Sequence, residues 1–507
     1  MTATPTGGDL VESPDVLIVG AGLAGLGMAV RLREAGQTDV VILEKAHEFG
    51  GTWRENTYPG CACDVASPMY SYSFAPNRSW TRMYAGQPEI LDYIRRVVKD
   101  HDIDGHIRYG TEAVSYRFDE AADRWVVRTR SGLEFRPRVV VMATGVLNKP
   151  NIPDFQGIED YTGTVFHSAN WDHSVDLAGK RVAVIGTGAS AVQFIPEIAR
   201  TAAHVDVFQR NAHWILPKAD RPLSSFEHRM FAAVPLTHRV YRMLAYWTHE
   251  VPVLAFLNPR FLTPLEIAAR RMLDKQIPDR ELRAKLVPSY KIGCKRILLT
   301  NDYLPTLMRP DVDLTTAAIS TFTETGIRTV DGRLHQVEVV ILGTGFTTDN
   351  RFATDQIVGR DGETIQYAWR DGMTAYLGMT VAGFPNMFLI MGPNSGGGAQ
   401  SILFVIENQI RYIVDCLRLM KARRATRLEV RAAVERSFNA RIHARLARSV
   451  WNTGGCHSWF LDHTGHNRQS WPGTGTGYRR ATRRPDERAF VLSNEATRRL
   501  ASDVLAR

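Results

Sequence analysis

The stretch DVLIVGAGLAG, residues 15–25, decides the fold of this chain. It begins as a short apolar run rich in β-branched residues, continues into a GxGxxG pattern, and is followed by small and apolar residues at helical spacing as far as Leu32. This order predicts a strand, a glycine turn and a helix. Gly20 permits the tight turn, Gly22 lets a pyrophosphate approach the backbone, and Gly25 lets helix and strand pack closely. The stretch therefore predicts a dinucleotide-binding fold, with the phosphates at the helix N-terminus.

A carboxylate at the end of the second expected strand sets the ribose preference of this site. The apolar run VVIL, residues 40–43, leads directly into Glu44. An acidic side chain in that place accepts hydrogen bonds from ribose hydroxyls and repels a 2′-phosphate. The first site is therefore expected to hold an unphosphorylated adenosine, as in FAD or NAD.

The same pattern recurs later in the chain with a different ending. The run RVAVI, residues 181–185, is an expected strand, and an apolar helix follows the turn as far as Ala199. The turn consists of Gly186, Thr187, Gly188, Ala189, Ser190 and Ala191. The next expected strand, residues 205–208, ends in Gln209 and Arg210 rather than in an acid. Because a guanidinium suits a 2′-phosphate, NADPH is favoured over NADH at this second site.

Two sites with opposite ribose preferences imply electron transfer from NADPH to FAD. Small residues at 143–145 and 343–346 end two further strand-like runs, and we expect them to mark the two passages between the domains. The fold class is therefore α/β, with two Rossmann-like dinucleotide-binding domains and a helical insertion. The expected boundaries are a flexible tail at 1–13, an FAD-binding domain at 14–146 and 350–507, an NADPH-binding domain at 147–218 and 292–349, and the insertion at 219–291.

The bulk composition is that of a globular enzyme. Of 507 residues, 44% are hydrophobic and 23% charged, and the mean hydropathy is -0.20. The net charge of +9 is spread along the chain without the interleaved aromatic and basic residues of an RNA-binding sheet, so no nucleic-acid partner is expected. The longest apolar stretch, residues 240–257, contains Arg242, His249 and Glu250, so no membrane span is expected.

Cysteine usage and the N-terminus favour a cytoplasmic location. The first thirteen residues lack the basic and apolar regions of a signal peptide. Five cysteines are an odd count, so a disulfide framework is not expected and a reducing compartment fits better. Cys61 and Cys63 have no partner pair at zinc-ligand spacing, and we interpret them as packing residues. No metal site is predicted.

A longer motif before the second glycine turn identifies a family resemblance. Tyr161, Gly163, His167 and Trp171 stand at the spacing of an aromatic residue, glycine, histidine and tryptophan that marks the type I Baeyer-Villiger monooxygenases, within the flavin-containing monooxygenase group. The first position is usually Phe, and Tyr161 keeps the ring. The resemblance extends from residue 15 to about residue 478 and is least informative in the insertion. Residues 455–459 and 471–473 resemble the acyclic-ketone and aryl-ketone branch of the family.

The resemblance implies a mechanism and a set of site residues. NADPH would reduce FAD, and oxygen added at flavin C4a would give a peroxide that attacks a ketone to form an ester or lactone. Arg296 matches the arginine that stabilises this anion, and Asp64 matches the carboxylate that pairs with it. Lys295 matches a second contact to the 2′-phosphate. Further cofactor contacts are implied at Gly51, Thr52, Trp53, Val65, Tyr70, Val114 and Trp471.

The sequence leaves several residue roles and functions open. His167 and Trp171 match linker residues that couple domain movement, although a histidine also invites a proton-transfer role. Trp471 either closes over NADP and substrate or anchors a loop. The expected partners are a hydrophobic ketone and O2, and the chain is expected to be a monomer or weak homo-oligomer. A flavin monooxygenase that makes N- or S-oxides and a redox-sensing module without turnover are the alternatives. A flavin disulfide reductase is disfavoured because Cys61 and Cys63 have the wrong spacing.

Overall fold

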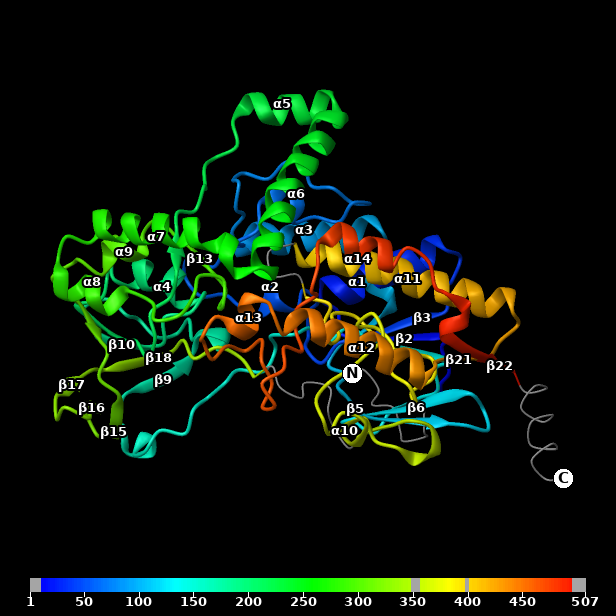
Figure 1. Cartoon of the computed structure of the whole chain (residues 1–507). Coiled ribbons are helices and arrows are strands. Elements are labelled where there is room, and N and C mark those ends of the chain that lie inside the picture. Colours follow the sequence, from blue (N-terminus) through cyan, green and yellow to red (C-terminus); the bar gives the residue numbers. More distant parts are fainter. Residues whose placement is uncertain (1–10, 348–355, 397–400, 495–507) are drawn as a thin grey trace, which may run out of the picture.

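The computed structural model describes residues 11–347, 356–396 and 401–494. Two five-stranded parallel sheets form its two halves, and the helical insertion lies above them in Figure 1. The first sheet has the order β20-β8-β2-β3-β4. Its strands are β20 (Met387–Leu389), β8 (Val139–Met142), β2 (Val16–Val19), β3 (Val40–Leu43) and β4 (Ile107–Arg108).

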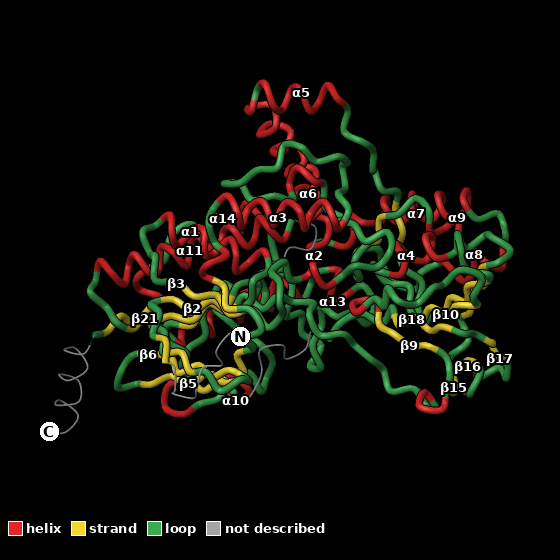
Figure 2. The backbone as a smooth tube through the Cα atoms, turned by 180° about the vertical axis from the view of Figure 1, so that it is seen from behind, coloured by secondary structure: helices red, strands yellow, loops and turns green. Residues whose placement is uncertain are grey.

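The strands of the first sheet are buried on both faces, which explains their unbroken apolar sequences. Val16 and Ile18 pack on the side of helices α1 (Leu23–Glu34), α3 (Gln87–Asp100) and α11 (Ile402–Ala422). Leu17 and Val19 point to the opposite face, where they pack in a second hydrophobic cluster with residues of a mixed sheet. That sheet consists of β1 (Val11–Glu12), β7 (Glu134–Phe135), β6 (Arg124–Thr129), β5 (Ala113–Asp119) and β19 (Ile357–Val358). Figure 2 shows the same three layers from behind.

The second parallel sheet repeats this plan. Its order is β14 (Val312–Thr315), β11 (His204–Phe208), β10 (Arg181–Ile185), β18 (Val339–Leu342) and β9 (Thr164–His167). Helices α4 (Ala191–Ile198) and α9 (Tyr303–Thr306) contact each other beside it. The opposite face carries an antiparallel meander of β15 (Ile319–Thr323), β16 (Gly326–Thr329) and β17 (Leu334–Gln336). The predicted α/β class with two nucleotide-binding sheets is confirmed.

The segment between the two halves of the second sheet is helical. It contains α5 (Ser225–Ala233), α6 (Pro235–Leu257), η5 (Pro259–Leu262), α7 (Thr263–Gln276) and α8 (Arg280–Leu286), and α5 projects from the molecule in Figure 1. The buried carboxylate of Glu250 on α6 accepts from the backbone N–H groups of Gly475 and Thr476, at 2.9 and 2.7 Å. These two hydrogen bonds tie the insertion to α14 (Gly475–Ala481). Within the described ranges no helix is long and apolar enough to cross a membrane.

Short elements complete the described chain. These are α2 (Thr52–Glu55), η1 (Ser67–Met69), η2 (Asp104–His106), η3 (Ile158–Asp160), η4 (Ser168–Asn170), β12 (Ile215–Leu216), β13 (Leu298–Leu299), η6 (Arg360–Gly362), α10 (Ile365–Ala368), β21 (Arg427–Val430), α12 (Ala432–Leu446), α13 (Val450–Thr453), η7 (Glu487–Ala489) and β22 (Phe490–Ser493).

Two antiparallel passages connect the sheets. The N–H of Asn151 donates to Gly345 O at 2.9 Å, and that of Thr347 donates to Lys149 O at 3.0 Å. The second passage, which includes the small residue Gly345, therefore pairs with residues 149–151 of the first. The expected boundary at 349/350 and residues 1–10 of the expected tail lie outside the described residues, whereas Val11–Glu12 pairs with β7.

One feature departs from the sequence analysis. Cys294 and Cys456 form a disulfide across 162 residues of sequence, although no disulfide framework was expected. An odd cysteine count carries no information about which two side chains the fold brings together. Cys61, Cys63 and Cys416 are free and buried, in agreement with packing roles for the first two.

Candidate active site

In the first glycine turn, one of the three glycines has free space beside its backbone, and the other two are tightly packed against other backbone atoms. A Cβ on Gly20, which has φ +104°, would lie 2.7 Å from Ala143 O, and one on Gly25 would lie 1.9 Å from Gly20 O. A Cβ on Gly22 would meet nothing closer than Gly51 Cα at 3.7 Å. Gly20 and Gly25 thus serve the tight turn and the helix packing, while Gly22 leaves the backbone accessible to a pyrophosphate.

Glu44 fixes this turn from the end of β3. Its side chain is 5% exposed, and its carboxylate accepts from the N–H of Ala21 at 2.9 Å and from the N–H of Ala46 at 3.0 Å. Arg54 lies 3.3 Å from the same carboxylate. Glu44 is therefore a hydrogen-bond acceptor held beside the glycine turn.

The neighbouring loop brings an aromatic pair to the first site. Gly51 has φ +53°, and a Cβ there would lie 3.0 Å from Gly22 Cα, so the two loops touch. Thr52 begins α2, and the indole N–H of Trp53 donates to Tyr70 Oη at 3.0 Å. Burial raises the pKa of Tyr70 well above its usual value, so its hydroxyl stays protonated.

The other two residues implied as FAD contacts lie on different elements. Val65 is buried, and its N–H donates to Cys63 Sγ at 3.3 Å. Val114 lies in β5 where the register with β6 shifts between Ala113 and Ser115. Such a bulge frees a backbone group from the ladder, which suits contact with a ligand at the sheet edge.

The second glycine turn has the same geometry as the first. A Cβ on Gly186, with φ +109°, would lie 2.4 Å from Gly343 O, whereas a Cβ on Gly188 would meet no protein atom within 4 Å. Thr187 is buried, Ala189 and Ser190 are less so, and α4 begins at Ala191. The residues present therefore fit a dinucleotide at both turns.

Two cations converge at the end of β11. Burial lowers the pKa of Lys295, and the charge of Arg210 lowers it further. The ammonium of Lys295 lies 5.1 Å from the centre of the Tyr290 ring. Within the described residues neither cation forms an ion pair with a carboxylate. Two like charges held together this way favour the binding of an anion between them.

Arg296 and Asp64 meet although 232 residues separate them in sequence. Nε and a terminal nitrogen of Arg296 lie 2.9 and 2.6 Å from the same carboxylate oxygen. The Arg296 side chain is 49% exposed, so the pair is accessible to a bound molecule. Asp64 raises the pKa of Arg296, with smaller contributions from Cys63 and Tyr70. This guanidinium is therefore a permanent positive charge next to the aromatic pair of the first site.

Two polar residues near this pair escaped the sequence analysis. Gln193 on α4 accepts from Tyr58 Oη at 3.1 Å and donates to Ala62 O at 3.0 Å, so the second turn's helix contacts the loop that ends in Asp64. Burial lowers the pKa of Lys218, which also interacts with Asp64. Neither belongs to a recognisable motif, and only the tertiary structure reveals them.

The motif residues at 161–171 lie along β9 and at both of its ends, with His167 at the end that faces the passage at Phe346. Tyr161 Oη donates to Val337 O at 2.9 Å, and a Cβ on Gly163 would clash with both Tyr161 Oη and Glu338 O. His167 is buried, its ring lies 5.9 Å from that of Phe346, and burial lowers its pKa. Trp171 packs between Phe166 and Phe194. These contacts favour the linker role over proton transfer.

Trp471 is 8% exposed and packs in the core. Its ring contacts Phe438 and Tyr478, and its indole N–H donates to Thr474 O at 3.2 Å. All of these partners come from the C-terminal part of the chain, so this conformation matches the loop-anchor reading.

A group of possible metal ligands lies at the other end of the second sheet. His204, Asp206 and Asp313 have ligand atoms within 4.8 Å of one another. Arg181 lies 3.8 Å from Asp206 and Arg333 lies 3.2 Å from Asp313, so guanidinium groups already balance both carboxylates.

Comparison with known proteins places these features in a family. The family described as pyridine nucleotide-disulphide oxidoreductase matches residues 17–225. Baeyer-Villiger monooxygenases of Streptomyces coelicolor and Pseudomonas aeruginosa are each 44% identical to this chain, over 94% and 95% of it and 92% and 93% of their own lengths.

Solved structures agree. An oxidized steroid monooxygenase bound to NADP superposes with a TM-score of 0.86 at 31% identity, covering 95% of this chain and 99% of that one. Cyclohexanone monooxygenase from Rhodococcus sp. Phi1 bound to NADP+ gives 0.86 at 27% identity, with the same coverage. OTEMO in complex with FAD and NADP gives 0.85 at 27% identity, covering 95% of this chain and 99% of that one. The chain therefore belongs to the Baeyer-Villiger monooxygenase family and is an FAD- and NADPH-dependent oxidoreductase.

Proposed function

We propose that this chain converts a hydrophobic ketone to an ester or lactone, with Arg296 and Asp64 as its catalytic residues. The pairing of Arg296 with Asp64 carries the proposal, because it sets a permanent cation near Tyr70, whose partner Trp53 lies on the loop that touches the first glycine turn. Bound FAD supplies oxygen activation and NADPH supplies the hydride. A fixed guanidinium stabilises negative charge that develops on oxygen during attack on the carbonyl.

The roles of the two turns follow from their charges. Gly20, Gly22, Gly25 and Glu44 would hold FAD, together with the loop at 51–53 and Val65, Tyr70 and Val114. The turn at 186–191 would hold the NADPH pyrophosphate, and Arg210 and Lys295 would hold its 2′-phosphate. His167 would couple the two halves through its contact with the passage at Phe346.

The expected domain boundaries and surroundings belong to the same proposal. Residues 14–146 with 350–507 form the FAD-binding domain, and residues 147–218 with 292–349 form the NADPH-binding domain. The insertion at 219–291 presents apolar side chains and would enclose an apolar substrate. The protein would act in the cytoplasm as a monomer or weak homo-oligomer.

The test is substrate-stimulated NADPH consumption by the yellow holoenzyme. Long-chain, cyclic and aryl ketones, sulfides and amines are offered separately, and products are identified by mass spectrometry. Ester or lactone formation from a ketone supports the proposal. Products limited to N- or S-oxides would support heteroatom oxygenation instead, and an absence of stimulated turnover would support a redox-sensing module.

A further inference from the structure

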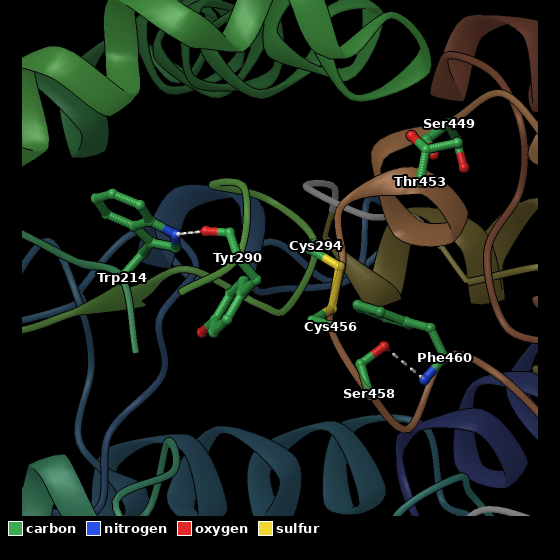
Figure 3. The surroundings of a disulfide bond; sticks show 8 residues. All are labelled: Trp214, Tyr290, Cys294, Ser449, Thr453, Cys456, Ser458 and Phe460. Carbon is green, nitrogen blue, oxygen red and sulfur yellow. Dashed lines mark hydrogen bonds between the residues drawn. A yellow bond between two sulfur atoms is a disulfide. The ribbon is translucent and has the colours of Figure 1, made fainter. Parts of the chain in front are cut away.

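The disulfide lies next to the proposed catalytic cation. Cys294 precedes Lys295 and Arg296 directly, and its Cα lies 6.1 Å from that of Cys456. Figure 3 shows the bond between the loop that carries Tyr290 and the C-terminal segment that carries Ser458 and Phe460. Cys294 is fully buried, and Cys456 is partly buried. The bond thus links the segment that carries Lys295 and Arg296 to a part of the chain that follows α13.

The loop at 290–294 is restrained on both sides. Trp214 Nε1 donates to Tyr290 O, and Lys291 N donates to Gly454 O, each at 2.9 Å. A Cβ on Gly293, with φ +88°, would lie 2.6 Å from the Phe256 ring, and one on Gly454 would lie 2.7 Å from Cys294 Cβ. The loop is therefore packed between α6 and α13, and among its own restraints the disulfide is the one nearest in sequence to Arg296.

Only residues 295–297 lie between Cys294 and the next backbone hydrogen bond. Backbone pairing resumes at Leu298, whose N–H donates to Trp214 O at 2.9 Å. Two residues of fully extended chain span about 7 Å at most, so the position of Arg296 is bounded by Cys294 on one side and by Leu298 on the other. The only ion pair of Arg296 in the described structure is with Asp64, which cannot by itself fix the backbone.

We propose that the Cys294–Cys456 disulfide is a positioning element of the active site, and that its reduction loosens the hold of Lys295 and Arg296 on NADPH and substrate. The inference rests on the proposed roles of those two cations. A dithiol such as dithiothreitol supplies the two electrons and two protons. The Sγ–Sγ bond breaks, both cysteines become thiols, and the reagent closes to its own disulfide.

The experiment compares four forms of the holoenzyme: oxidised wild type, dithiothreitol-treated wild type, C456S, and the control C416A. Cys416 is buried and free, so its variant reports the effect of a lost core thiol alone. NADP+ affinity is measured by calorimetry without turnover, and coupling is the ester formed per NADPH consumed. We expect the reduced and C456S enzymes to bind NADP+ about tenfold more weakly, or about 1.4 kcal/mol, and to couple poorly. Reoxidation restores the wild type but not C456S.

Three results would overturn the proposal. Alkylation of all five cysteines in the oxidised protein would show that the bond does not form. A lower Tm with unchanged NADP+ affinity and coupling would show a purely structural bond. Equal losses in C416A would show a general effect of core damage. Since NADP+ binding needs no ketone, a failure to find a substrate would contradict the proposed function and leave this test intact.

Discussion

Arg296 Nε donates to one oxygen of Asp64 and a terminal nitrogen lies 2.6 Å from the same oxygen, a geometry that depends on the guanidinium fork. Lysine would keep the charge but has no fixed fork, and a desolvated ammonium loses its proton more readily. We expect R296K to form ester about a hundredfold more slowly, because losing one preorganised donor costs about 3 kcal/mol. The loss should appear in the ester measured by gas chromatography, while NADPH oxidation continues without product.

A surface pair of the same type provides the control. Arg309 and Asp311 are 2.6 Å apart on an exposed turn before β14. R309A should leave ester formation unchanged. If R296K matched the wild type, or if R309A lost as much activity, the assigned role of Arg296 would be wrong.

Arg210 determines the coenzyme preference in this scheme. R210A should lower kcat/KM for NADPH about tenfold, since one charge-assisted hydrogen bond contributes about 1.5–3 kcal/mol. The value for NADH should stay constant, because that coenzyme lacks the phosphate. Steady-state kinetics with both coenzymes measure the ratio. R200A, which removes an exposed arginine paired with Glu197 at 2.8 Å, is the matched control, and an equal loss with NADH would argue against phosphate recognition.

At the level of single elements, substitutions of two glycines distinguish an effect on folding from an effect on cofactor binding. Alanine inside a helix normally stabilises it by about 1 kcal/mol relative to glycine. In α1 the sign reverses, because a Cβ on Gly25 would lie 1.9 Å from Gly20 O. We therefore expect G25A to lower both Tm and FAD content. In G188A the new methyl meets no protein atom within 4 Å, so Tm should be unchanged while KM for NADPH rises about tenfold or more.

Thermal unfolding and flavin absorbance distinguish the two glycine variants. Gly105 also has nothing within 4 Å of a Cβ, and G105A should alter neither quantity. A G25A protein with an unchanged Tm and a full content of bound FAD would contradict the packing argument. A G188A enzyme with normal KM would mean that the pyrophosphate lies elsewhere.

The sequence predicted the elements whose signal is local. The apolar runs at β2, β3 and β10 and the glycine turns between strand and helix were placed within one residue, since burial on both faces demands continuous apolar sequence. The two-residue strand β1 has no such signal and exists only through its pairing with β7. The meander β15–β17 was also not predicted, because its strands become recognisable only where they cover the second sheet.

The residues of the site likewise divide into those with a local sequence signal and those without one. Spacing and charge led to the prediction of Glu44 and Arg210, whereas that of Asp64 and Arg296 came from the family resemblance, because no local pattern joins residues 232 positions apart. Gln193, Lys218 and the partner of Cys294 had neither kind of signal. Their roles arise from long-range contacts that only the folded chain provides.

Across the whole molecule, buried histidines set the acid limit of stability. Burial, assisted by nearby Lys295, lowers the pKa of His213 to about 4. Burial also lowers the pKa of His238 and of His443 to about 4, with Arg242 and Arg468 as the largest charge contributions. These side chains are neutral in the folded protein below pH 6.5, where the unfolded chain binds protons. Stability is therefore complete above pH 6.5 and is lost as the pH falls toward 4.

His238 gives the clearest test, since it is 2% exposed on α6, away from both glycine turns in sequence. Each such histidine contributes about 1.4 kcal/mol per pH unit to the slope of unfolding free energy between these limits. H238Q should reduce that slope by this amount, measured by denaturant unfolding at pH 7.5, 6.0 and 5.0. H463Q, at an exposed position, should leave the slope unchanged. A wild-type slope near zero over this range, or an H238Q slope equal to that of the wild type, would mean that His238 becomes protonated without global unfolding, through local opening of the helical insertion.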